Sequence, residues 1–235
     1  MRRRSFLREV LRSTPGKLGA TLALILGIAS VMVVLTFPLD FGSSRWSNPS
    51  VWADNPKAVP PAWTAVLASE AAAEHRILEA DTPSDSTERG SARVDIYDLA
   101  FEYTEDLPPS FLSFSLGPVS YLERPPSLSV TLLRPDGTQL PLLRTTVRGP
   151  RPTEEPPFIR HDETPLRVLI SAEPETAEAA STMLQESYGV DIPASRLEGE
   201  VTSAMFGVPD ENGALVPLRG DYVIQVRAAL AQPED

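Results

Sequence analysis

The chain has 235 residues, 42% of them apolar, with 24 prolines, no cysteine and a formal net charge of −11. This composition excludes a disulfide framework and a thiolate metal site, because both need cysteine. The negative charge excludes nucleic acid as a partner, since the phosphate backbone repels an acidic surface.

An uncharged apolar run covers residues 18–37 and reads LGATLALILGIASVMVVLTF, with Pro38 directly after it. At about 1.5 Å per residue, a helix of this length spans about 30 Å, the thickness of a bilayer's hydrocarbon core. The run therefore predicts a single transmembrane helix over residues 18–37, with the lipid bilayer as its surroundings.

The charges on the two sides of this run predict its orientation. Residues 1–17 carry six basic residues and one acidic residue, whereas the remainder carries fifteen basic and thirty-one acidic residues. Basic residues that flank a first membrane helix stay in the cytoplasm. We expect a single-pass protein of the cell (inner) membrane, with a cytoplasmic basic tail at 1–17 and an extracytoplasmic C-terminal domain.

A cleaved signal peptide is the alternative, and Arg3-Arg4-Ser5-Phe6-Leu7 resembles a twin-arginine signal. The apolar run is longer than the ~7–15 residues of a signal's apolar region, and no Ala-x-Ala site follows it. Retention of the anchor is the better prediction. Within the tail, SFLREVLR is either a short amphipathic helix at the membrane interface or an unstructured basic segment, and Pro15-Gly16 is expected to break it before the membrane helix begins.

All three tryptophans, Trp46, Trp52 and Trp63, fall within residues 38–63. Indole rings favour the headgroup region of a membrane, and the Asn-Pro and Pro-Pro steps of this segment favour turns and extended geometry. We predict a rigid membrane-proximal collar over residues 38–63. The alternative is that the tryptophans belong to the core of the outer domain.

The motif P-L-D-F-G…W-S-N-P…W-x-D-N-P-K-x-x-P-P-x-W over residues 38–63, directly after a first membrane helix, resembles inner-membrane permease subunits of dipeptide/oligopeptide-type ABC transporters. The resemblance is to a branch with a large extracytoplasmic insertion after that helix. Pro15-Gly16-Lys17-Leu18-Gly19, Phe206-Gly207-Val208-Pro209-Asp210 and Leu218-Arg219-Gly220-Asp221-Tyr222 fit the same pattern. The resemblance implies three partners: a second permease subunit, cytoplasmic ATPase subunits and an extracytoplasmic peptide-binding protein.

Such permeases continue with a Gly-Thr-Asp…Arg-Asp segment, further membrane helices and a cytoplasmic Glu-Ala-Ala…Gly loop that contacts the ATPase. This chain stops at Gln232-Pro233-Glu234-Asp235 and resembles only the N-terminal portion. A truncated reading frame, a split gene and a fragment are all compatible with it. We expect the chain to transport nothing alone. The competing hypothesis is a free-standing single-pass protein whose outer domain is an extracytoplasmic binding or scaffold module.

Residues 64–235 are predicted to form an extracytoplasmic α+β domain, mainly antiparallel strands with one or two helices. An alanine-rich helix is expected over residues 61–77, and a polar surface loop or linker over 79–92. A strand over 94–103 is expected to bulge near Tyr97-Asp98, because its apolar alternation changes phase there.

The clearest hairpin joins residues 128–132 to 140–142 through the turn Pro135-Asp136-Gly137. A helix is predicted over 174–188, capped by Gly189, with Ala177, Ala180, Met183 and Leu184 on one face. The remaining predictions are a proline-rich loop at 149–157 and strands at 166–171, 201–206 and 222–230, the last two joined through residues 210–213, with Tyr222, Ile224, Val226 and Ala228 facing inward.

No catalytic, cofactor-binding or metal-binding residue is predicted, and the chain is not expected to be an enzyme. Its two histidines, His75 and His161, show no ligand spacing. Lys57 is the only lysine beyond the membrane helix, which argues against a serine–lysine dyad. The run Asp210-Glu211-Asn212-Gly213 lacks the spacing of a calcium loop and is better explained as a hairpin turn.

Overall fold

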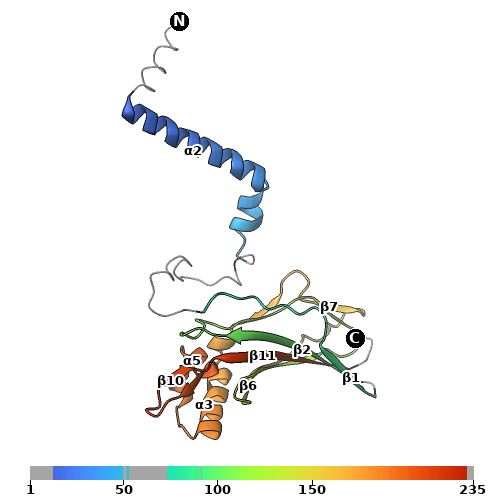
Figure 1. The fold of residues 1–235 in the computed structure, drawn as a ribbon. Coiled ribbons are helices and arrows are strands. Elements are labelled where there is room, and N and C mark those ends of the chain that lie inside the picture. The colour runs from blue at the N-terminus through green and yellow to red at the C-terminus, as the bar shows by residue number, and fades with distance from the viewer. Residues whose placement is uncertain (1–12, 50–51, 53–72, 91, 232–235) are drawn as a thin grey trace. The chain divides into compact units, whose positions relative to one another are not determined.

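The computed structural model describes residues 13–49, 52, 73–90 and 92–231 (Figure 1). The chain divides into two compact units, Met1–Lys57 and Ala58–Asp235, and each is described by itself. The first unit is helical, and the second is an α+β domain with antiparallel sheets, which confirms the predicted fold class at that level.

Helix α2 spans Thr14–Thr36 and is long and apolar enough to cross a membrane, by length and composition. Ser13 caps it, because its Oγ accepts a hydrogen bond from the Gly16 N–H at 3.1 Å. The prediction that Pro15-Gly16 precedes the helix is wrong: proline is tolerated in the first helical turn, where its missing N–H needs no partner. The predicted amphipathic segment at 5–12 lies outside the described residues.

A single π-helical turn, η1 (Gly42–Trp46), follows α2 within the first unit. The hydroxyls of Ser43 and Ser44 both donate to the Asp40 carbonyl, at 3.0 and 2.9 Å, which satisfies an acceptor at the start of the turn. The described part of the predicted collar is therefore a compact turn. Most of the collar's second half, including Trp63, lies outside the described residues.

The second unit is built on a five-stranded antiparallel sheet with the strand order β1-β2-β11-β5-β6. The long β11 lies between β2 and β5, and it pairs with both along most of its length. The strands are β1 (Asp85–Arg89), β2 (Ala92–Tyr103), β5 (Ser127–Leu133), β6 (Gln139–Thr146) and β11 (Gly220–Leu230). The predicted hairpin is β5–β6, and its turn is closed by Gly137 at φ +83°.

Strand β2 pairs with β11 in one continuous register, from Arg93 opposite Leu230 to Tyr103 opposite Gly220. The bulge predicted near Tyr97-Asp98 is therefore wrong. The apolar alternation is interrupted because Asp95, 3% exposed, occupies an inward position, where Arg93 and Ser86 bond its carboxylate at 2.7 and 2.5 Å. The irregularity in the sheet lies instead between Val130 and Thr131 of β5.

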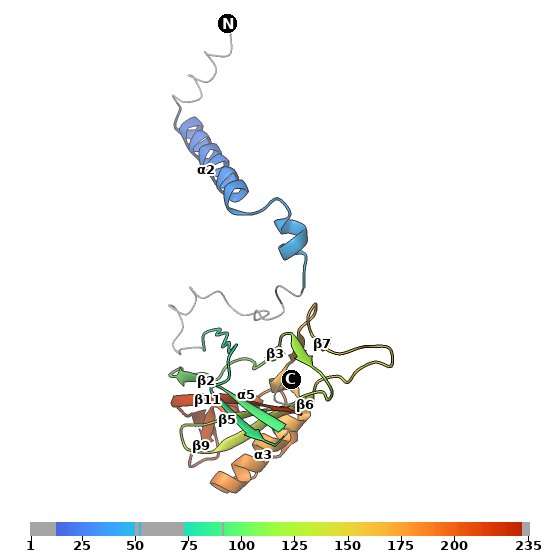
Figure 2. The same cartoon turned by 90° about the vertical axis from the view of Figure 1, so that its right-hand side faces the viewer.

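Helix α3 (Pro174–Tyr188) lies on one face of this sheet, as both views show (Figures 1 and 2). It begins with a proline in its first turn and ends at Gly189 in the left-handed conformation, as predicted. The Thr176 hydroxyl bonds the Leu142 carbonyl of β6 at 3.2 Å, which fixes the helix to the edge of the sheet. The hydrophobic core lies between α3 and the sheet. It includes Leu128, Val130, Leu132, Leu140, Ala177, Ala180, Leu184, Tyr222 and Val226.

Two predictions at the start of this unit need correction. Residues 73–77, the end of the predicted alanine-rich helix, form neither helix nor strand, and the rest of that prediction, 61–72, lies outside the described residues. Helix propensity is a weak prior that tertiary contacts override, and Arg76 is bonded here to the end of β2. The segment predicted as a polar loop contains β1, whose charged residues are typical of a protected edge strand.

Residues 201–206 were expected to be a strand, but Val201–Met205 forms helix α5. Val201, Ala204 and Met205 are all buried, and their i, i+3, i+4 spacing matches a helix. The predicted strand at 166–171 is shorter than expected and gives way to a 3₁₀ turn. The remaining elements are β3 (Phe114–Leu116) with β8 (Leu166–Val168), β4 (Val119–Tyr121) with β7 (Phe158–Arg160), η3 (Ile170–Ala172), α4 (Ala194–Leu197) and the hairpin β9 (Gly207–Pro209)–β10 (Leu215–Pro217).

Candidate functional site

Helix α2 carries apolar side chains on every side, and none of its residues is buried by protein. Leu18 is 67% exposed and Leu35 is 78% exposed. A helix that is apolar all round belongs in a protein core or in a membrane. The described residues leave α2 uncovered, and by length and composition it could cross a membrane.

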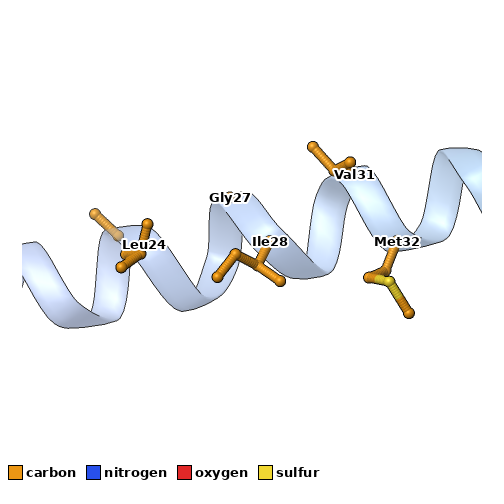
Figure 3. Close-up of a pocket in the computed structure, with 6 residues that line it drawn as sticks. Leu24, Gly27, Ile28, Val31 and Met32 are labelled. Atoms are coloured by element: carbon orange, nitrogen blue, oxygen red, sulfur yellow. The ribbon is translucent and has the colours of Figure 1, made fainter.

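A shallow apolar groove of ≈ 470 Å³ runs along α2 at Gly27. Leu24, Ile28 and Met32 form one row beside it, while Gly27 adds no side chain (Figure 3). A Cβ placed on Gly27 meets nothing within 4 Å. The residues that line the groove carry neither charge nor hydrogen-bonding side chains, so this face of α2 is wholly apolar.

The turn after α2 is closed by a pair of tryptophans. The Trp46 and Trp52 rings meet edge to face, with centroids 5.8 Å apart. The Trp52 indole N–H donates to the carbonyls of Arg45 and Trp46, at 2.9 and 3.2 Å. Both indoles remain partly exposed, at 70% and 41% for Trp46 and Trp52. The arrangement gives a firm turn with an amphipathic aromatic surface.

In the second unit, the most connected polar group is a buried arginine at the end of β5. The Arg134 side chain is fully buried and donates to the carbonyls of Ala204 and Gly207, at 3.0 and 2.7 Å. It also lies 3.1 Å from the Met183 sulfur. Arg134 therefore ties the sheet to α3 and to the α5–β9 junction.

Asp136 and Tyr188 complete this cluster. The Arg134 guanidinium lies 3.3 Å from the Asp136 carboxylate and 5.8 Å from the Tyr188 ring centroid, and Tyr188 donates to Asp136. Burial raises the pKa of Asp136, but hydrogen bonds from Tyr188 and Thr138 and the charge of Arg134 outweigh it and hold that pKa below its usual range. The positive charge of Arg134 and the hydrogen bonds within the cluster therefore stabilise the ionised form of Asp136.

An aromatic cluster lies where β2, β11 and α5 meet. The Phe206 ring centroid is 5.2 Å from that of Tyr222 and 5.3 Å from that of Tyr103, and Phe101 stacks on Tyr222 at 5.7 Å. Burial raises the pKa of both tyrosines, so they remain neutral phenols. The Tyr222 hydroxyl donates to the Leu218 carbonyl at 2.7 Å, whereas the Tyr103 hydroxyl has no partner among the described residues. The four rings belong to the domain's core or pack against it.

The two histidines occupy unrelated surroundings. His75 lies before β1 in a segment that is neither helix nor strand, not in a helix as expected, and its ring centroid is 6.3 Å from that of Phe111. His161 has a φ of 62° in the loop after β7. Within the described residues no group of three or more His, Asp or Glu side chains could hold a metal ion. The 210–213 run is the β9–β10 turn, where Asp210 accepts from the Asn212 and Ala214 N–H groups at 2.8 Å.

Sequence reasoning missed the Arg134 cluster, since Arg134 and Tyr188 are distant in the chain. The available signal was an arginine at the end of an apolar strand, directly before a turn. Comparisons with protein-family models, with curated proteins and with solved structures found no match.

Proposed function

We propose that α2 spans the cell membrane, with residues 1–17 in the cytoplasm and the α+β domain outside. The apolar surface of α2, of which the described residues bury nothing, supports a membrane location. The basic residues before it support the orientation. The Trp46–Trp52 turn then lies at the outer headgroup region, where partly exposed indoles are favourable.

We further propose that the chain is a component of a peptide-type ABC transporter permease. The observation that carries this proposal is the Trp- and Pro-rich motif at 38–63, directly after the apolar helix, with its resemblance to those permeases. Other subunits supply transport and ATP hydrolysis: a second permease subunit, cytoplasmic ATPases and an extracytoplasmic peptide-binding protein. The α+β domain braces or docks that binding protein.

A second candidate is a free-standing anchored scaffold or binding module. The observation that favours it is the self-contained core, since the buried apolar residues of the described chain all lie between Tyr103 and Ala228. Such a domain needs no further membrane helix to complete its packing.

Purification of the full chain from its native membrane in mild detergent distinguishes the two candidates. The transporter proposal expects an ATPase, a second permease subunit and a peptide-binding protein to co-purify. A pairwise Trp46→Ala/Trp52→Ala variant, compared with Trp46→Phe/Trp52→Phe, tests whether the aromatic turn matters to assembly. Recovery of the chain in the membrane fraction without any ATPase contradicts the transporter proposal and favours the scaffold.

Topology is tested separately. A reporter that is active only outside the membrane, fused after Asp235, is expected to be active, and the mature protein is expected to retain Arg2 to Lys17. A silent reporter, or a mature N-terminus beyond Phe37, overturns the anchor and its orientation.

A further inference from the structure

Residues 73–83, called the strap here, run beside the C-terminal half of β2 without joining the sheet (Figure 1). Strand β1 pairs with β2 only from Asp85 onward, opposite Ile96. Ser84 adds the last bonds, from its N–H to the Ile96 carbonyl at 2.7 Å and with Asp98. Pro83, directly before it, has no N–H to donate to a ladder.

Arg76 anchors the other end of the strap. Its guanidinium donates to the Glu102 carbonyl at 2.5 Å and to the Glu105 carboxylate at 2.7 Å. The Glu105 side chain is only 10% exposed and also accepts the Thr104 N–H at 2.8 Å. The acceptor is thus held in place by the domain, while the Arg76 side chain is 41% exposed.

Little else holds the strap between these two ends. Every residue from 74 to 82 is exposed, including Ile77 at 61% and Leu78 at 37%. Because residues 77–82 bury little apolar surface, the strap is docked mainly at its Arg76 end, where the His75 ring also lies 6.3 Å from the Phe111 ring. Segments of this kind, with few buried contacts, open at low free-energy cost.

We propose that the strap is a releasable tether, docked on the domain by Arg76 and freed when the Arg76 bonds break. In chain order the strap lies between α2 and β1. A force applied to the chain from the α2 side therefore loads the Arg76 bonds before it loads the Ser84 bonds. Release frees the chain from Arg76 to Ser84, which adds about 26–29 Å of maximum reach between helix and domain. This inference requires an anchored helix but not a transporter.

The test measures distances between spin labels in the full chain, reconstituted in nanodiscs. The chain has no cysteine, so Glu79→Cys on the strap and Arg227→Cys on β11 give one specific pair. In this background we expect one narrow distance population. Arg76→Ala is expected to shift the ratio of docked to released strap about tenfold toward release, with a broad distribution. Arg76→Lys, which keeps the charge but not the two-pronged geometry, falls between them.

The matched control is Arg151→Ala, which removes an exposed arginine from the Arg151–Glu154 pair far along the chain and leaves the strap distances unchanged. A second label pair, Glu123→Cys with Arg227→Cys, reports whether the fold survives Arg76→Ala. Raising the salt concentration releases the strap in the parent chain but not further in Arg76→Ala. Equal distributions with and without Arg76, or a broad distribution in the parent chain, overturn the proposal.

Discussion

Helix α2 and the five-stranded sheet keep their apolar side chains in opposite environments. Leu35 of α2 is 78% exposed, whereas Leu132 of β5 is fully buried. All backbone hydrogen bonds of a helix are local, so α2 forms within one window of sequence. The sheet needs partners from distant segments, such as Phe101 opposite Tyr222.

The difference shows that the two units are stabilised by different surroundings. The domain buries apolar side chains in its own core, while the described residues bury none of α2. Changes to the two units should therefore have separable effects, and the following variants test that separation.

The largest effect is expected from charges in α2. The double variant Leu24→Arg/Ile28→Arg places two arginines near the middle of the helix, at a cost of about 3 kcal/mol each for membrane insertion. The expected result is loss of the chain from carbonate-washed membranes, with no change in the domain's resistance to urea in pulse proteolysis. The control Leu24→Ile/Ile28→Leu keeps the chain in the membrane. Unchanged partitioning of the arginine variant contradicts a membrane-spanning α2.

A truncation in the core of the domain should lower the domain's stability and leave membrane partitioning unchanged. Phe206→Ala removes a ring that is 2% exposed and contacts three other aromatic side chains. We expect the free energy of unfolding of the domain to fall by about 4 kcal/mol, while membrane partitioning stays the same. Phe206→Leu, which retains most of the volume, is expected to cost about 1.5 kcal/mol or less. Equal losses in the two variants contradict the packing role.

The buried arginine gives a somewhat smaller effect. Arg134→Met fills the space but removes the donors to Ala204, Gly207 and Tyr188, and leaves Asp136 without its cation. Destabilisation of about 3 kcal/mol is expected in urea unfolding. Arg151→Met, on an exposed pair, changes stability by no more than about 0.5 kcal/mol. Comparable effects at both positions contradict the role assigned to Arg134.

The smallest effect concerns pH. The folded-state pKa of Asp136 is held below its usual range, so this carboxylate stabilises the domain above the unfolded-state pKa of about 3.9. That stabilisation is lost as pH falls through the folded-state pKa. The parent chain is expected to be more stable than Asp136→Asn. This difference in unfolding free energy should have its maximum value at pH 6 and should decrease below about pH 4. A difference that stays constant between these conditions rules this linkage out.

Local signals were sufficient for several elements. Pro174 and Gly189 bound α3, the alternation and turn at Pro135-Asp136-Gly137 marked the β5–β6 hairpin, and Tyr222 to Ala228 alternated as an inward face. In each case the sequence pattern and the element that it predicts lie in the same short segment of the chain. These elements were predicted because their neighbours in sequence determine their shape.

Two of the wrong predictions depend on the pairing of β1 with β2. The inward Asp95 of β2 is bonded by Ser86 of β1 as well as by Arg93 of its own strand, and β1 has too few apolar residues to be recognised before that pairing is known. The error at 201–206 was local, since the i, i+3, i+4 spacing of a helix was present in that segment. The Arg134 cluster joins β5, α3 and the α5–β9 junction, which only the tertiary fold brings together.

The central position of β11 has a consequence for the order of events during biosynthesis. Its two neighbours, β2 and β5, are not bonded to each other, and β11 follows both of them in the chain. A ribosome delivers β11 after every other strand of the sheet, so the sheet stays divided until that late moment.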